Sequence, residues 1–187
     1  MYTIADHVGL VVAGITADAN ILINNLRIYA QDHLFRFDEP IPVEQLVRRV
    51  CDLKQSYTQF GGLRPFGIAF LYAGYDDQYG FQLYQSDPSG NYSGWKASAI
   101  GANSQAAQSV LKSEYKDDMT LNEAIGLALR VLAKTIDSNQ INENKVDLAV
   151  LAKSGNSPVF KILSKEEVAK LVKEHEADIK KKDDDKD

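Results

Sequence analysis

The sequence predicts an α+β fold in which antiparallel sheets lie between layers of helices, an α/β/β/α arrangement. Two observations support this prediction. Strand-like segments come in runs and helix-like segments come in pairs, which is typical of antiparallel sheets covered by helices. The stretch Gly61–Gly101 reads as three successive strands between two such helix pairs, and it holds the only tryptophan, Trp95. A strict alternation of single strands and helices, typical of dinucleotide-binding folds, does not occur.

The first part of the chain reads as one strand followed by two helices. The apolar run His7–Ala13 predicts a buried strand. Thr16 is a good N-cap, and a helix is expected from there to Phe37. Its apolar positions, expected to face inward, are Ile21, Leu22, Leu26, Tyr29, Ala30, Leu34 and Phe37. A second helix is expected over Pro42–Gln59, with an apolar stripe of Val43, Leu46, Val47, Val50, Leu53 and Tyr57.

Three strands are then expected at Phe66–Tyr72, Tyr79–Gln85 and Tyr92–Ile100. A turn is predicted at 74–77. Asp87-Pro88-Ser89-Gly90 has the composition of a tight β-turn, with proline second and glycine fourth. Two interpretations of Trp95 stay open, a core residue of this meander or a surface contact.

The last third predicts two helices, a hairpin and a final helix. Asn103 or Ser104 is expected to cap the first helix, with Ala106, Ala107, Val110, Leu111 and Tyr115 inward. Thr120 and Glu123 form a capping box for the second, with Ala124, Leu127, Ala128, Val131, Leu132 and Ile136 inward. After a loop at 137–144, strands are expected at Lys145–Lys153 and Val159–Leu163. Ser164 and Glu167 form another capping box, which opens a helix with Val168, Leu171 and Val172 inward.

Length and composition predict a single domain over residues 1–179 and a charged, disordered tail over 180–187. The net charge of −5 argues against nucleic acid as the main partner. A single cysteine rules out an internal disulfide and favours the cytosol or nucleus. No apolar run approaches the ~20 residues of a membrane span, and we expect no secretion signal at the start of the chain.

The residue types that carry chemistry show no pattern of a site. His7, His33 and His175 share no ligand-like spacing with one another or with Cys51, so no metal site is expected. Cys51 follows Val50 in a predicted helix, and we expect a buried, inert thiol. We therefore predict no catalytic, cofactor-binding or metal-binding residue, and no cofactor.

Paired acidic residues and paired glycines have simple structural interpretations. Asp76-Asp77 and Asp117-Asp118 are neighbours in predicted turns, and neighbours rarely form a two-carboxylate site. We interpret both pairs as solvated turns. Gly61-Gly62 follows a helix rather than a strand, which favours a helix stop over a phosphate loop.

Three longer motifs carry a family resemblance. These are YTQFGGLRPFG at 57–67, SDPSGNYSGWKASAIG at 86–101 and DDMTLNEAIGLAL at 117–129. With them, the chain from His7 to about Glu174 resembles proteasome alpha subunits, most specifically the subunit at the third position of the alpha ring. The resemblance implies the N-terminal-nucleophile hydrolase fold, with two stacked antiparallel sheets between two helix layers.

The same resemblance implies a non-catalytic structural subunit of the 20S core particle, which serves ubiquitin-dependent protein degradation in the cytoplasm and nucleus. Its implied partners are other alpha subunits in a seven-membered mixed ring, beta subunits, and activators that dock on the ring. Assembly, substrate gating and activator docking are the implied roles. The family's first two long helices pack on the beta ring; here these are Thr16–Phe37 and Pro42–Gln59.

This sequence departs from the family pattern at its start. Family members carry an N-terminal segment ahead of the Met1–Thr3 region, with the gating tail, a helix, a strand hairpin and the lysine of the activator pocket. We therefore expect no strand hairpin ahead of His7, and a bare sheet edge. A partial gene model, a shortened isoform and a fragment that does not assemble all remain open alternatives.

An active threonine protease is the enzymatic alternative. That chemistry needs a threonine whose own free α-amine acts as the base. Thr3 follows Met-Tyr in this sequence. No hairpin is expected to carry the supporting lysine and acid, so a non-enzyme is favoured.

Overall fold

The computed structural model describes residues 1–136, 141, 143–155 and 157–175, which form two compact units. The first unit comprises Met1–Lys96 and Ala149–Lys161. The second comprises the described residues of Ala97–Leu148 and those from Ile162 onward. The single domain over 1–179 stays a prediction. The tail at 180–187 and most of the loop at 137–144 lie outside the described residues.

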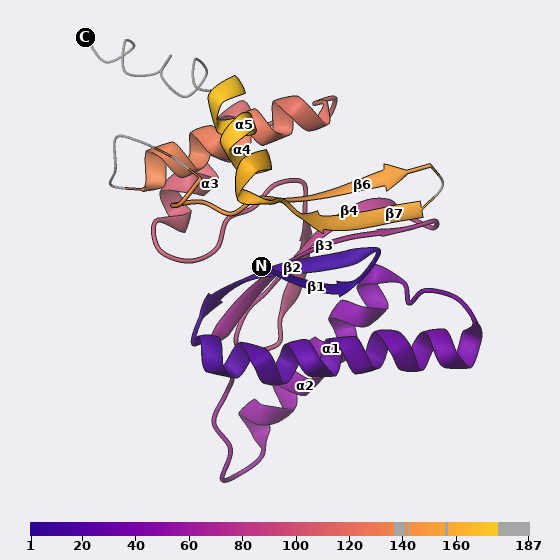
Figure 1. Cartoon of the computed structure of the whole chain (residues 1–187). Helices are drawn as coiled ribbons and strands as arrows, with labels where there is room; N and C mark the ends of the chain where they lie inside the picture. Colours follow the sequence, from indigo (N-terminus) through magenta and orange to yellow (C-terminus); the bar gives the residue numbers. More distant parts are fainter. Residues whose placement is uncertain (137–140, 142, 156, 176–187) are drawn as a thin grey trace. The chain divides into compact units, whose positions relative to one another are not determined.

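A five-stranded antiparallel sheet forms the centre of the first unit, and its strands lie side by side in chain order (Figure 1). The strands are β1 (Tyr2–Ala5), β2 (Val8–Gly14), β3 (Ile68–Asp76), β4 (Gly80–Ser86) and β5 (Tyr92–Trp95). The predicted three-strand meander is confirmed as β3 to β5. One strand ahead of His7 was not predicted: β1, in which Thr3 pairs with Gly9 of β2.

Two strand ends differ from their predicted positions. β3 continues past Tyr72 because its pairing with β4 runs on until Asp76 faces Gly80. The turn predicted at 74–77 therefore lies at 77–79. β5 ends at Trp95 instead of Ile100, where its pairing with β4 stops.

The predicted β-turn between β4 and β5 is confirmed. The Gly90 amide donates to the Asp87 carbonyl at 3.2 Å, and the φ of Gly90 is 88°. A Cβ at Gly90 would lie 2.5 Å from the Cys51 carbonyl oxygen. Only glycine therefore allows this turn to pack so closely on the helix that contains Cys51.

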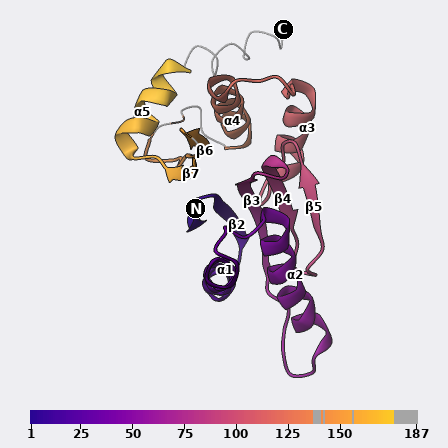
Figure 2. The same ribbon diagram turned by 90° about the vertical axis from the view of Figure 1, so that its right-hand side faces the viewer.

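Helices α1 (Thr16–Phe37) and α2 (Val43–Gln59) cover one face of the sheet (Figures 1 and 2). Both helices lie within about one residue of their predicted bounds. The predicted cap is wrong: Ile15 is the N-cap of α1, and Thr16 is its first helical residue. The core between helices and sheet includes Val8, Leu10, Leu22, Leu26, Leu46, Val47, Val50, Ile68, Phe70 and Tyr72.

A hairpin of β6 (Ala149–Ser154) and β7 (Ser157–Ile162) packs on the opposite face of the sheet. The Phe160 amide donates to the Asp6 carbonyl at 2.8 Å. The Phe160 ring fills the space where Gly9 lacks a side chain, since a Cβ there would lie 2.2 Å from it. The first unit thus has three layers. β6 begins at Ala149, four residues later than predicted.

The second unit contains α3 (Ser104–Glu114), α4 (Leu121–Thr135) and α5 (Lys165–Glu174). Both predicted capping boxes are present, with Thr120 and Glu123 on α4 and Ser164 and Glu167 on α5. One apolar cluster joins α3 to α4 through Ala107, Leu127 and Val131. Another joins α4 to α5 through Leu129, Val146, Leu148, Val168 and Val172.

Some predicted details of these helices are wrong. Ala106, Ala124 and Ala128 are exposed, whereas Ala107 on α3 and Leu127, Leu129 and Val131 on α4 are the residues buried in the clusters. Asn103 does occupy the N-cap of α3, but its side chain donates to the Thr135 carbonyl at 2.9 Å instead of capping. The helices and two antiparallel sheets confirm the predicted α+β sandwich class.

Candidate assembly surface

Thr3 lies inside β1, so its backbone nitrogen is a peptide amide and not the free α-amine that a threonine protease needs. Its carbonyl accepts hydrogen bonds from Nε and Nη2 of Arg27 at 3.2 and 2.9 Å. The guanidinium of α1 thus covers part of the sheet edge at β1. Thr3 therefore takes part in the structure through its backbone, which is paired with β2 and bound by Arg27.

The three histidines and the cysteine do not come together. His7 is buried, with Nε2 lying 2.8 Å from the Ile41 carbonyl. His33 is buried against Phe37 on α1, and its Nε2 lies 3.9 Å from a carboxylate oxygen of Glu39. Within the described parts of the chain, no three His, Cys, Asp or Glu residues are placed to hold a metal ion.

Cys51 lies buried in α2, as predicted. Burial raises the pKa of its thiol to about 11. The thiol is therefore protonated near neutral pH, and it packs as a small apolar group.

Asp76 has a role that the sequence interpretation missed. Its carboxylate accepts the amide of Val43, the first residue of α2, at 3.1 Å. It also accepts the amides of Gln78 and Tyr79 in the β3–β4 turn. Burial raises the pKa of Asp76, but these hydrogen bonds and one from Gln82 outweigh burial and hold that pKa below its ordinary value. Asp76 is thus a helix cap supplied from another element, whereas Asp77, Asp117 and Asp118 are exposed as predicted.

Lys54 was also not expected in the interior. It is fully buried, and its Nζ donates to the Ser86 hydroxyl at 2.9 Å and to the Ile68 and Asp87 carbonyls at 3.2 Å each. Nζ also lies 4.7 Å from the centre of the Phe70 ring. Burial lowers the pKa of the ammonium to about 8. The sequence feature that could have indicated this burial is the position of Lys54, four residues after Val50 on the apolar face of α2.

Helix α1 is apolar on two sides, and only one of them is buried. Leu22, Leu26 and Ala30 face the core as predicted. Ile21, Leu34 and Phe37 were predicted inward but are exposed. The sequence pattern could not separate the two sides, because apolar residues occur all round the helix.

The outward side carries a regular apolar row, which we call the α1 seam: Ile21, Ile28 and Phe35. These side chains are 51%, 62% and 91% exposed, and they recur every seven residues. A seven-residue spacing places side chains along one line of a helix, the pattern by which helices pack on each other. Singly exposed apolar residues are normal, but an aligned row of large ones marks a contact surface.

A shallow hollow of about 460 Å³ lies on this side of α1, lined by Arg27, Ile28, Gln31, Asp32 and Phe35. Its charged rim is already held in place. The Asp32 carboxylate pairs with Arg36 at 2.7 Å and with Arg49 of α2 at 3.7 Å. Ile28 and Phe35 are left as the apolar contact groups.

A second exposed apolar feature of the first unit is the loop Phe60–Gly67 between α2 and β3. Phe60 and Leu63 are both exposed at its tip. Trp95 is also 46% exposed at the end of β5, with its Nε1 donating to the Ser93 hydroxyl at 2.8 Å. Of the two interpretations of Trp95, this exposure favours the surface contact over a core position.

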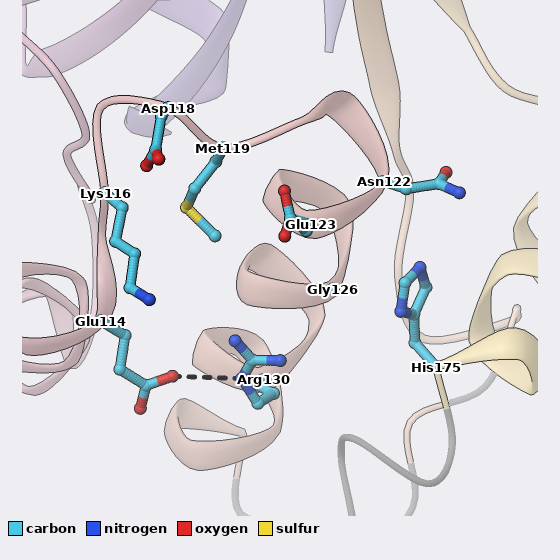
Figure 3. A pocket seen from close by; sticks show the side chains of 9 residues that line it. All are labelled: Glu114, Lys116, Asp118, Met119, Asn122, Glu123, Gly126, Arg130 and His175. Carbon is cyan, nitrogen blue, oxygen red and sulfur yellow. Dashed lines mark hydrogen bonds and ion pairs between the residues drawn. The ribbon is translucent and has the colours of Figure 1, made fainter.

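The second unit contains a polar pocket of about 390 Å³ beside α4 (Figure 3). Its charged groups are largely committed to internal contacts. Arg130 donates to Glu114 at 3.1 Å, and Glu123 is engaged in the Thr120 capping box. His175 lies over Gly126, where a Cβ would be 2.9 Å from Nδ1. Through these contacts the residues that line the pocket join α3, α4 and the end of α5.

None of the described helices combines the length and apolar character that a membrane crossing requires. Several exposed apolar groups stand out on the surface of the first unit, among them Ile28, Phe35 and Phe60. Their chemistry suits packing against protein.

Comparison with known proteins agrees with the sequence motifs. The family model described as "Proteasome subunit" matches residues 1–151. Proteasome subunit alpha type-4-A of Arabidopsis thaliana is 57% identical over 176 residues, covering 94% of this chain and 70% of that relative. Proteasome subunit alpha type-4 of Spinacia oleracea is 64% identical over 149 residues, covering 80% of this chain and 60% of the relative. The alpha type-4 subunit of Dictyostelium discoideum is 56% identical over 175 residues, covering 93% and 70%.

Proposed function

Because this chain belongs to the proteasome subunit family, we propose that it is a non-catalytic structural subunit of the alpha ring of the 20S core particle. The names of its relatives support the alpha type, and in particular alpha type-4. The structural observation that carries the proposal is the α1 seam. A subunit that works by assembly needs such a surface, whereas an enzyme needs a reactive site.

Burial of the α1 seam against a partner would stabilise an assembly through the hydrophobic effect. Fully burying a side chain the size of isoleucine or phenylalanine contributes about 1.5–3 kcal/mol. Ile21, Ile28 and Phe35 gain little of this within the first unit, because they are exposed there. We propose that a helix of a beta subunit packs along the seam.

The wider roles follow from this placement. Other alpha subunits in a seven-membered ring and beta subunits are the proposed partners, with activators docking on the ring. The proposed process is ubiquitin-dependent protein degradation, in which the ring supports assembly, gating and activator docking. Residence in the cytoplasm and nucleus is part of the same proposal and is supported by the family resemblance.

Threonine-protease activity is the less favoured alternative. Thr3 is part of a paired strand, and its carbonyl is held by Arg27. We propose that the endopeptidase activity of the complex resides in other subunits. A peptidase assay on the isolated chain should stay at background, and threonine-directed hydrolysis above background would overturn this assignment.

Co-expression with the remaining alpha and beta subunits tests the assembly. Tagged wild-type chain should co-purify with them as one large particle. Phe35→Ser should shift the tagged chain toward the free form by about tenfold or more, since one buried aromatic contact is lost. Tyr79→Ser is the matched control, because Tyr79 is an exposed aromatic residue in the β3–β4 turn, away from α1.

A tagged wild-type chain that remains free or aggregates would contradict the assembly proposal. It would favour the alternative of a shortened product that does not assemble. Equal incorporation of Phe35→Ser and wild type would remove the seam as the contact surface.

A further inference from the structure

An ion pair ties the first turn of α1 to the loop Phe60–Gly67. Arg64 Nη1 lies 2.7 Å from Asp18 Oδ2, and Nη2 lies 2.8 Å from Oδ1. This is the two-pronged geometry that fixes a guanidinium against a carboxylate. Asp18 is only 6% exposed, so one partner of the pair belongs to the packed body of the unit.

The same carboxylate also holds the end of the loop. The Gly67 amide donates to Asp18 Oδ2 at 3.0 Å, and the Ile15 amide donates to the Gly67 carbonyl at 3.0 Å. A Cβ at Gly14 would lie 2.2 Å from that carbonyl oxygen. The loop is therefore anchored where β2 passes into α1.

The tip of the loop has few contacts of its own. Gly61 and Gly62 have open space around them, with no heavy atom within 4 Å of an added Cβ. Gly62 has a φ of 85°, and Phe60 and Leu63 are exposed. Figure 2 shows this loop extending beyond the end of α2, away from the sheet. Arg64 directly follows the tip, so its anchor limits where the tip can go.

We propose that Asp18 and Arg64 are positioning residues, which hold the loop Phe60–Gly67 in one conformation so that its apolar tip is ordered before assembly. A loop already held in its bound form loses less conformational entropy when a neighbouring subunit contacts it. The link to assembly rests on the proposed function; the anchoring of the loop does not.

The ion pair is present throughout the neutral pH range. The hydrogen bond from Arg64, helped by the Gly67 amide, lowers the pKa of the Asp18 carboxyl to about 2. The anchor is therefore constitutive, and its contribution should not change between about pH 5 and 8.

Hydrogen exchange of the full chain, followed by mass spectrometry, tests the anchoring. Arg64→Met keeps an apolar stem and removes the donors. The Gly67 amide, which donates to Asp18, should then exchange about tenfold faster or more, while the amides of β2 and β3 keep their protection. Arg64→Lys keeps the charge but has no guanidinium to bind both carboxylate oxygens of Asp18, so it should restore part of the protection. Lys165→Met is the control: it breaks an exposed pair with Asp147 in the second unit and should leave the loop unchanged.

Wild-type exchange of the loop in a folded Arg64→Met chain would overturn the proposal. If that variant unfolds as a whole, Arg64→Lys decides, since unchanged loop exchange in it would equally overturn the proposal. Incorporation into the ring is the second readout, and Arg64→Met should enter less readily than wild type. Equal entry would remove the assembly role. Failure of the wild type to enter would count against the proposed function alone, because loop exchange is measured on the free chain.

Discussion

Replacing Lys54 with methionine tests whether a charged ammonium is held in the interior. The methionine stem has similar length and fills the same space, but it has no charge and no donors. Lys54 Nζ donates to the Ser86 hydroxyl and to the Ile68 and Asp87 carbonyls. These contacts satisfy the charge, while burial lowers the pKa of the ammonium from 10.5 to about 8.

Because of this lowered pKa, the free energy of unfolding depends on pH. Between pH 8 and 10.5 the unfolded chain binds more protons at Lys54 than the folded chain, so stability rises with pH. The full difference corresponds to about 3 kcal/mol. About 1 kcal/mol of it should be gained between roughly pH 7.5 and 9.

The neighbouring Cys51 opposes this gain. Burial raises the pKa of its thiol from 9.0 to about 11, so the folded chain keeps a proton that the unfolded chain loses, and stability falls as pH rises through that range. Over roughly pH 7.5 to 9 this loss is only a few tenths of a kcal/mol. The Lys54 contribution should therefore dominate the difference between wild type and variant.

Urea unfolding at the two ends of this pH window is the assay. The wild type should gain about 1 kcal/mol relative to Lys54→Met as the pH rises. Lys165→Met is the control, because Lys165 pairs with Asp147 on the surface of the second unit and its loss should not change the slope. The same slope in wild type and Lys54→Met would refute the assignment of a buried, charged lysine.

Three further substitutions test other parts of the structure by unfolding free energy. Asp76→Ala should cost about 0.5–2 kcal/mol, because Val43 at the start of α2 loses its acceptor. Trp95→Ala should cost about 1–2 kcal/mol, less than the ~3–5 kcal/mol of a fully buried ring, since the residue is already 46% exposed. Gly90→Ala should cost about 2 kcal/mol or more, because its φ is 88° and the new Cβ would meet the Cys51 carbonyl.

Each of these has a clear contrary result. Asp77→Ala is the control for Asp76, and equal losses in the two variants would reject the capping role. A loss at Trp95 as large as that of a core aromatic would show that the ring is covered. A neutral Gly90→Ala would mean that the turn does not pack on α2 as closely as the structure has it.

The sequence predicted the elements better than the faces they bury. α1 was found from Thr16 to Phe37, because helix spacing continues without a break over that range. Which of its apolar sides faces the sheet could not be predicted, since Ile21 and Leu22 are equally apolar neighbours. That choice depends on sheet residues distant in sequence, such as Leu10 and Phe70.

The candidate surface was predictable only in part. The resemblance implied that α1 and α2 pack on the beta ring, but not that Ile28 and Phe35 form the exposed row. The roles of Lys54 and Asp76 depend on contacts between elements, with Ser86 for the first and Val43 for the second. β1 was missed because it is a four-residue strand, recognisable by its partner β2 and not by its own pattern.

The most direct test of the central claim is the native mass of particles that contain the tagged chain. Our account predicts a particle in which this 20.7 kDa chain occurs with other alpha and beta subunits. Phe35→Ser should reduce that species relative to the Tyr79→Ser control. A wild-type chain found only at its own mass, with no other proteasome subunit bound, would contradict the account.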